Sequence, residues 1–337
     1  MRSTENSTID SSTHTAAKLL CVAPMMAWTD RHCRYLHRLY SPNALLFTEM
    51  VTTGALLHGQ QWQLLDYAPE EHPLALQLGG NKPEDLAACT REAARRGYDE
   101  VNLNVGCPSD RVQQGTFGAC LMLKPQLVAD CIKAMQDASP VKVSVKCRLG
   151  VDDHDSDPAL LEFIETVAAV ECRRFYVHAR KAILGGLTPA QNRSIPPLQP
   201  WRVHMIKQQL PHLEIIVNGG ITEAAQVRDH LTWADGVMIG RAAYHNPMLL
   251  TALDQEMFQQ DHAVSTERII QQYLDYMQRE LDRGTRLSTM TRHLLHCCNG
   301  RPGARKFRRL LSDSKRLKQN DMSVVHEAIG QVFTEAA

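Results

Sequence analysis

Several common features are missing from this sequence, and each absence excludes a class of protein. No apolar run approaches the roughly 20 residues that are needed to span a bilayer, so we expect no membrane segment. Lys and Arg (37) balance Asp and Glu (37), so net charge gives no argument for a nucleic-acid partner. The ten cysteines include no CxxC pair, which favours reduced thiols in a cytoplasmic protein over a disulfide framework. Residues 1–17 are rich in Ser and Thr and lack the apolar core of a signal peptide, so we interpret them as a disordered extension.

What the chain does contain is a repeated alternation of short apolar runs and helical segments between Leu19 and Arg241. Eight such units in this length predict an α/β fold of the (β/α)8 TIM-barrel type. A doubly wound sheet is the alternative, but it usually has fewer strands and a glycine-rich first loop, whereas the first loop here is Ala-Pro-Met-Met. The expected strands are 19–23, 44–47, 74–78, 100–104, 141–146, 174–177, 214–217 and 236–239.

Beyond Arg241 the pattern predicts helices alone, at 265–281, 287–298, 304–317 and 324–333. We therefore divide the chain into the extension (1–17), a barrel domain (18–250) and a small C-terminal α-helical bundle domain (251–337). Between Arg283 and Lys318 there are eleven Lys or Arg residues and one acid, Asp313. This basic block suits a phosphate backbone, although a solvated helix face is the ordinary explanation of a charge run.

Polar residues follow nearly every expected strand, and barrels place their active sites at these ends. The most distinctive is Cys107, which ends the run Asn102–Pro108, where a proline stiffens the turn. The glycines and the arginine after the last two strands suit a phosphate-bearing cofactor, although a tight turn explains either glycine motif alone. The polar or titratable strand ends are Glu49, Gln77, Asn104, Lys146, Arg148, His178, Arg180, Asn218 and Arg241.

A possible metal site competes with these residues. His293, His296 and Cys297 have a spacing that allows them to share one face of a helix, as metal ligands do. No second ligand pair lies nearby in the sequence, and a helix buried in a bundle explains them equally well. We therefore predict no metal.

The motifs in combination resemble the flavin-dependent tRNA-dihydrouridine synthases, and most of all their subfamily A. The resemblance covers about residues 18–320, with one departure at Ala27, where the subfamily has an acidic residue. The matching segments are APMMAWTDR (23–31), LQLGG (76–80), NLNVGCP (102–108), GACLM (118–122), VKCR (145–148), VHARKA (177–182), NRSIPPL (192–198) and NGGI (218–221).

This resemblance implies an FMN enzyme that takes reducing equivalents from NADPH and reduces uridine to 5,6-dihydrouridine at positions 20 and 20a of the tRNA D-loop. It implies that Cys107 is the acid that protonates C5 on the face opposite the flavin, and a thiol, with an ordinary pKa of about 8.5, is protonated near neutral pH. Neither a membrane nor an obligate protein partner is implied. The alternatives are an FMN-dependent oxidoreductase of free pyrimidines or another small enone, and a non-enzymatic RNA-binding module.

The resemblance also implies roles for individual residues. Gln77 meets the edge of the flavin ring, Lys146 its N1–C2=O edge, and His178 contacts FMN. Asn104 either reads the substrate base through its amide or caps the strand end. The remaining expected cofactor residues are Pro24, Met25 and Met26 as an apolar floor and Asn218, Gly219, Gly220, Gly240 and Arg241 around the phosphate. The expected tRNA-orienting residues are Arg193, Lys306 and Arg309.

Overall fold

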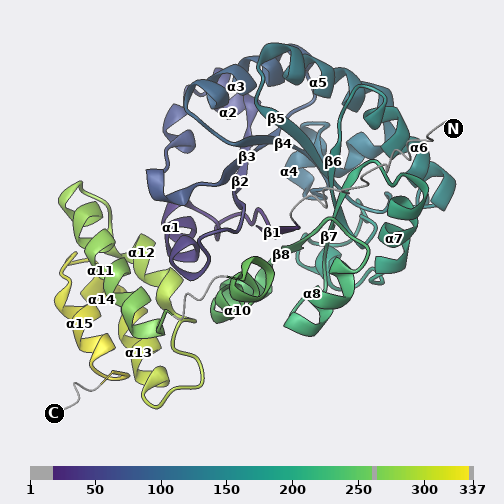
Figure 1. The fold of residues 1–337 in the computed structure, drawn as a ribbon. Helices are drawn as coiled ribbons and strands as arrows, with labels where there is room; N and C mark the ends of the chain where they lie inside the picture. The colour runs from purple at the N-terminus through teal and green to yellow at the C-terminus, as the bar shows by residue number, and fades with distance from the viewer. Residues whose placement is uncertain (1–17, 260–263, 334–337) are drawn as a thin grey trace, which may run out of the picture.

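A computed structural model describes residues 18–259 and 264–333. The predicted disordered extension, 1–17, lies outside the described residues, as do 260–263 and 334–337 of the predicted helical domain. Within the described part, eight parallel strands form a barrel that is wrapped by helices (Figure 1). The strands are β1 (Leu19–Val22), β2 (Leu46–Thr52), β3 (Leu74–Gly79), β4 (Glu100–Val105), β5 (Lys142–Cys147), β6 (Arg174–His178), β7 (Glu214–Asn218) and β8 (Gly236–Ile239).

The sheet closes on itself, which confirms the predicted barrel. Its order is β1-β8-β7-β6-β5-β4-β3-β2, and the last gap is bridged at Leu45. The Leu45 N–H donates to the carbonyl oxygen of Leu20 (2.9 Å), and the Val22 N–H donates to that of Leu45 (3.0 Å). Because all eight strands are parallel, their carboxyl ends open onto one face of the barrel.

The barrel is surrounded by α1 (Arg31–Tyr40), α2 (Thr53–Leu57), α3 (Pro83–Arg95), α4 (Asp110–Gln114), α5 (Pro125–Ala138), α6 (Asp157–Ala168), α7 (Pro200–Gln209), α8 (Ala224–Leu231), α9 (Arg241–His245) and α10 (Met248–Phe258). Short 3-10 turns occur at Trp62–Leu65, Pro69–Glu71, Gly118–Leu123 and Gln191–Arg193. The helical part contains α11 (Thr266–Asp282), α12 (Leu287–Leu294), α13 (Ala304–Leu311), α14 (Ser314–Leu317) and α15 (Ser323–Ile329). No helix among the described residues is both long enough and apolar enough to cross a membrane.

Several boundaries differ from the expectation. The boundary that we drew at residue 250 falls inside α10, which packs on β1 and α8 of the barrel, so the helical part begins with α11. Strand β2 continues to Thr52 through an irregularity between Phe47 and Met50, where polar residues interrupt the apolar run. The helix expected at 304–317 divides at Asp313, whose carboxylate accepts hydrogen bonds from the backbone N–H groups of Lys315 (3.0 Å) and Arg316 (3.2 Å).

The interior of the barrel has an apolar side and a polar side. The apolar side contains Phe47 and Tyr176, whose rings meet edge to face at 5.1 Å, together with Ile216 and Met238. The polar side is built by the inward positions of β3, β4 and β5, since alternate residues of a strand face the same way. These inward residues are Gln77, Glu100, Asn102, Asn104, Ser144 and Lys146.

The helical part is joined to the barrel through the loop after β1 and through α1. The carboxylate of Asp30, at the end of that loop, lies 3.0 Å from Nε2 of His293 on α12. Arg31 pairs with the buried Glu280 of α11, and the Nδ1 atom of His32 lies 2.7 Å from the Tyr276 hydroxyl. The loop that borders the barrel mouth is therefore held by the helical part.

Candidate active site

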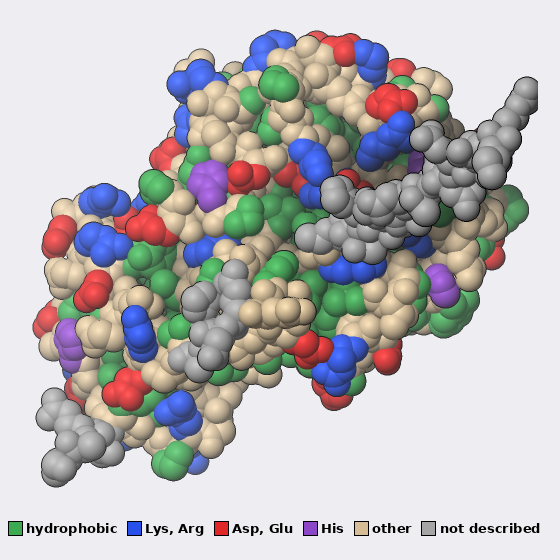
Figure 2. All heavy atoms as spheres, viewed as in Figure 1, with side chains coloured by type: hydrophobic (Ala, Val, Ile, Leu, Met, Phe, Trp, Pro, Cys, Tyr) green, Lys and Arg blue, Asp and Glu red, His purple; other side chains and the backbone are tan. Residues whose placement is uncertain are grey.

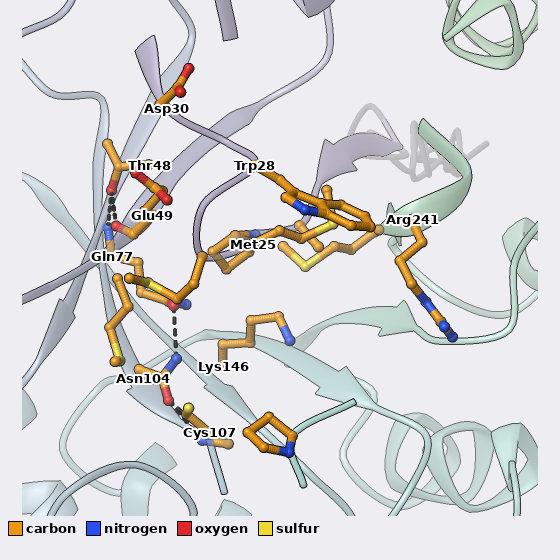
Figure 3. A pocket seen from close by; sticks show the side chains of 18 of the residues that line it. Met25, Trp28, Asp30, Thr48, Glu49, Gln77, Asn104, Cys107, Lys146 and Arg241 are labelled. Atoms are coloured by element: carbon orange, nitrogen blue, oxygen red, sulfur yellow. Dashed lines mark hydrogen bonds between the residues drawn. The ribbon is translucent and has the colours of Figure 1, made fainter. Parts of the chain in front are cut away.

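A cavity of about 1310 Å³ opens at the carboxyl ends of the strands (Figure 3). The loop after β1 and the ends of β2–β8 form its walls, and Thr289 of α12 lines it from the helical part. The structure brings together here every residue that we expected at the flavin, together with Cys107, Asn104 and Arg193. Lys306 and Arg309 lie elsewhere, on the exposed side of α13. Met26, expected with Pro24 and Met25 as an apolar floor, lines the cavity with 61% of its surface exposed.

Cys107 lies on the loop after β4 and is one of two cysteines that are not fully buried. Its backbone N–H donates to the side-chain oxygen of Asn104 (3.0 Å), and its carbonyl oxygen accepts from the N–H of Ala119 (2.9 Å). Its thiol lies 3.5 Å from the hydroxyl of Ser109. The backbone on both sides of the thiol is thus fixed, so that the sulfur faces the cavity (Figure 3).

Arg148, a strand-end residue to which no role was assigned from the sequence, supports this loop. Its Nε donates to the carbonyl oxygen of Gly106 (2.8 Å), and one of its terminal nitrogens donates to those of Lys181 (3.1 Å) and Asn192 (3.0 Å). Only a guanidinium offers donors in this forked arrangement. The segment VKCR contained the residue, but only the fold shows that it braces three loops.

The wall formed by β5 to β8 is strongly cationic. Burial, with Arg193 and Arg180 also acting against the charge, lowers the pKa of Arg148 to about 10. Burial and Arg241 lower the pKa of Arg193, and the same two causes lower that of Arg180. Cations that destabilise one another in this way form a site that gains stability when an anion binds. The donor set therefore fits the phosphate of the expected cofactor.

Lys146 and His178 lie deeper in the same wall. Burial and the neighbouring Arg148 lower the pKa of Lys146 to about 8, and its ammonium donates to Asn218 at 3.1 Å. Burial, with Arg148 and Lys146 adding to it, lowers the pKa of His178 well below its ordinary value, so its imidazole is neutral. Gly219 has φ 112°, and a Cβ there would lie 2.7 Å from the His178 ring. A side chain at this position would thus close the space beside His178.

The amides of Gln77 and Asn104 are engaged within the protein. Gln77 donates to Asn102 (2.8 Å) and accepts from Asn104 (2.7 Å), and Asn104 accepts from the N–H groups of Gly106 (3.1 Å) and Cys107 (3.0 Å). Asn104 therefore caps the strand end, which was one of our two readings of it. Each amide retains one N–H beyond these contacts for a bound molecule.

The wall that faces the first loop carries the carboxylate of Glu49, a strand-end residue to which no role was assigned from the sequence. Glu49, from the irregular segment of β2, accepts a hydrogen bond from the backbone N–H of Ala27. Burial raises the pKa of Glu49, and the nearby Asp30 raises it further. Ala27 adopts φ 61°, a left-handed conformation that Asn and Asp tolerate better than Ala.

The basic block of the helical part is less one-sided in the fold than in the sequence. Arg316 pairs with Glu327 at 2.7 Å, and Arg283 pairs with Glu280 at 2.9 Å, so acids from outside the block neutralise two of its charges. Figure 2 shows basic and acidic side chains intermixed over this part of the surface. Lys306 and Arg309 are both exposed on α13.

The three residues of the possible metal site have separate partners. His293 meets Asp30 and the Tyr244 hydroxyl (3.1 Å), His296 meets His245 (3.2 Å), and the Cys297 thiol donates to the carbonyl oxygen of His293 (3.8 Å). Across residues 18–259 and 264–333, no group of three or more His, Cys, Asp or Glu side chains is arranged to hold a metal ion.

Comparisons with known proteins agree on one family. The family model described as dihydrouridine synthase matches residues 21–334. The tRNA-dihydrouridine(20/20a) synthase of Vibrio cholerae is 51% identical over 315 residues, which cover 93% of this chain and 96% of that protein. The protein of the same name from Escherichia coli K12 is 52% identical over 310 residues, covering 91% of this chain and 90% of that one.

Solved structures with a similar fold are far more distant in sequence. A 2-naphthoyl-CoA reductase matches with a TM-score of 0.55 at 10% identity, covering 70% of this chain and 50% of that one. An old yellow enzyme homologue from Zymomonas mobilis matches with a TM-score of 0.52 at 12% identity, covering 73% of this chain and 90% of that one. These likenesses concern the barrel fold alone.

Proposed function

Because this chain belongs to the dihydrouridine synthase family, we propose that it reduces uridine to 5,6-dihydrouridine at positions 20 and 20a of the tRNA D-loop, using FMN and NADPH. The observation that carries the proposal is the placement of Cys107. Its thiol faces the cavity beside the cationic wall, since Arg148 of that wall donates to the neighbouring Gly106, and the same wall carries a glycine-opened cradle. A proton donor and an anion-binding wall in one cavity are what the reduction of a base on a phosphate-bearing cofactor requires.

The residues of the chain divide the work of this reaction. Reduction of the C5=C6 bond needs a hydride at one carbon and a proton at the other, and the flavin supplies the hydride when bound. Cys107 gives its thiol proton to C5, becomes a thiolate, and regains a proton from solvent. Lys146 presents a cation within the cavity, suited to the negative charge of a reduced ring, while Arg241, Gly219 and Gly220 hold the phosphate.

The same cavity has to admit both the reductant and the target base. Its volume of about 1310 Å³ exceeds the roughly 300–1,000 Å³ of common ligand pockets, so it has room for a cofactor and one further group. We propose that NADPH and the uridine occupy this space in turn. A uridine that enters a barrel has to leave its stack, so the base is flipped out of the tRNA.

The direct test measures NADPH oxidation by the purified flavoprotein with unmodified tRNA, with fully modified tRNA and with free uridine or uracil. We expect oxidation to continue only with unmodified tRNA, and dihydrouridine to appear at positions 20 and 20a when tRNA from a strain lacking the enzyme is mapped. Sustained turnover of free pyrimidines without tRNA would support the small-enone alternative instead.

A second test concerns the tRNA surface. Replacing Lys306 and Arg309 together by Ala should weaken tRNA binding and lower the salt slope of the affinity by about two, since each phosphate contact contributes roughly one. The matched control replaces Arg91 of α3 and Lys133 of α5, which are exposed on the outside of the barrel. If both double variants changed binding equally, the RNA surface would lie elsewhere.

A further inference from the structure

A chain of hydrogen-bonded buried side chains runs through the barrel from Glu100 of β4 to the backbone of Cys107. We propose that Glu100, Ser144 and Asn102 are positioning residues, which hold the loop of the acid through the amides of Gln77 and Asn104. This role rests on the proposed function of Cys107 as the acid.

Each link of the chain is a short hydrogen bond between buried groups. The Ser144 hydroxyl donates to Glu100 (2.5 Å), and Asn102 donates to Ser144 (2.8 Å). Gln77 donates to Asn102 (2.8 Å), and Asn104 donates to Gln77 (2.7 Å; Figure 3). The chain ends where the Asn104 oxygen accepts the N–H groups of the Cys107 loop. Asn104, at 8%, is the most exposed side chain among these links.

Glu100 fixes the donor-to-acceptor direction of this hydrogen-bond chain. A carboxylate only accepts hydrogen bonds, so Glu100 makes the Ser144 hydroxyl a donor, which in turn makes Ser144 an acceptor for Asn102. Each amide then has one workable orientation, because a flipped Gln77 would place its oxygen against the oxygen of Asn102. As a result Asn104 turns its oxygen toward the N–H groups of Gly106 and Cys107.

Glu100 is itself firmly held at the opposite end of β4. Arg174 donates to one carboxylate oxygen (2.7 Å), and the Tyr176 hydroxyl donates to the other (2.9 Å). The apolar side of the same barrel, with Phe47, Ile216 and Met238, is filled without any such chain. A buried polar side chain destabilises the fold unless all its hydrogen-bonding groups have partners. Filling the barrel interior alone therefore does not explain why this side is polar.

The test removes a link of the chain without touching its ends. Ser144→Ala deletes the hydroxyl that joins Asn102 to Glu100, and Asn102→Asp removes the donor to Ser144 while keeping an acceptor for Gln77. The control is Tyr176→Phe, which deletes a hydrogen bond to the same oxygen of Glu100 but lies off the path. Either of the first two variants suffices if the other does not fold.

We expect Ser144→Ala and Asn102→Asp to lower kcat about tenfold with unmodified tRNA, since misplacement of a reacting group by about 1 Å can cost about 100-fold. The KM for tRNA and the bound flavin should stay unchanged, and Ser144→Thr, which keeps the hydroxyl, should restore kcat. The second readout is the rate at which iodoacetamide alkylates Cys107, with Cys120, the other partly exposed cysteine, as the reference. We expect this alkylation rate and its pH profile to change in Ser144→Ala and Asn102→Asp, and to remain as in wild type in Tyr176→Phe.

Two results would overturn the inference. One is a wild-type kcat and a wild-type rate of Cys107 alkylation in both Ser144→Ala and Asn102→Asp. The other is an equal loss of kcat in Tyr176→Phe, which would show that removing any buried hydrogen bond here has the same effect. Alkylation needs no tRNA, so its outcome is separate from the proposed function. A wild-type protein that does not reduce tRNA would refute that function and leave the alkylation comparison valid.

Discussion

Lys146 gives the sharpest prediction from the electrostatics of the site. Burial and Arg148 lower its pKa from the ordinary 10.5 to about 8, which corresponds to a cost of about 3 kcal/mol for carrying the charge in the flavin-free protein. Lys146→Met removes this cost but also the hydrogen bond to Asn218, worth about 1 kcal/mol. We therefore expect the flavin-free variant to be about 2 kcal/mol more stable than wild type at pH 7.

The pH dependence distinguishes this explanation from better packing. Below pH 8, Lys146 is protonated in both the folded and the unfolded state, so its cost is present in full. Between pH 8 and 10.5 the folded protein loses the proton before the unfolded chain does, so the stability of wild type rises and the advantage of Lys146→Met shrinks. Urea unfolding at pH 7 and pH 9.5 measures both quantities.

A control on the same strand completes the design. Lys142 lies at the other end of β5 and its side chain is 46% exposed, so Lys142→Met should change stability by no more than about 0.5 kcal/mol. If Lys146→Met were no more stable than wild type at pH 7, or kept an equal advantage at pH 9.5, the account of the cationic wall would be refuted.

Three further predictions concern the junction, the acid limb and the Cys107 loop. Glu280→Gln should lower the free energy of unfolding, measured in urea, by about 2 kcal/mol. This is less than for a fully buried ion pair, because its partner Arg31 is 35% exposed. The control Glu256→Gln, at an exposed pair with Arg228, should lower it by no more than about 1 kcal/mol. Burial lowers the pKa of His32 to about 4, so the free energy of unfolding of wild type should fall as the pH drops from 6.5 to 4. His32→Gln should reduce this fall by up to about 3 kcal/mol. If the fall were the same in His32→Gln, another group would be responsible for it. Arg148→Lys should lower kcat roughly tenfold without changing the KM for tRNA, because an ammonium cannot make the three hydrogen bonds of the guanidinium. Full activity of this variant would show that these hydrogen bonds are dispensable.

Much of the site could be predicted because parallel strands repeat a simple rule. Alternate residues face one way, and the carboxyl ends meet on one face. The sequence alone therefore places Gln77, Asn104, Lys146, His178 and Asn218 together. All five line the cavity. The barrel was predictable for the same reason, since each apolar run marked one strand.

The parts that could not be predicted depend on contacts between distant segments. Asn102 and Ser144 stand opposite each other on neighbouring strands, but only the register of β4 and β5 shows this. The basic block appeared unopposed because Glu280 and Glu327, which neutralise two of its arginines, lie outside it in the sequence. The strand expected at 44–47 ended too early because the polar Thr48 and Glu49 interrupt its apolar run, although β2 continues through them and both line the cavity.

The central claim is that Cys107 protonates uridine during its reduction in tRNA. It is tested most directly by a single turnover of the pre-reduced flavoprotein with unmodified tRNA, measured as dihydrouridine formed per enzyme. We predict prompt formation with wild type, and almost none with Cys107→Ala that retains its flavin. Dihydrouridine formed by Cys107→Ala at the wild-type rate, or none formed by wild type, would contradict the account.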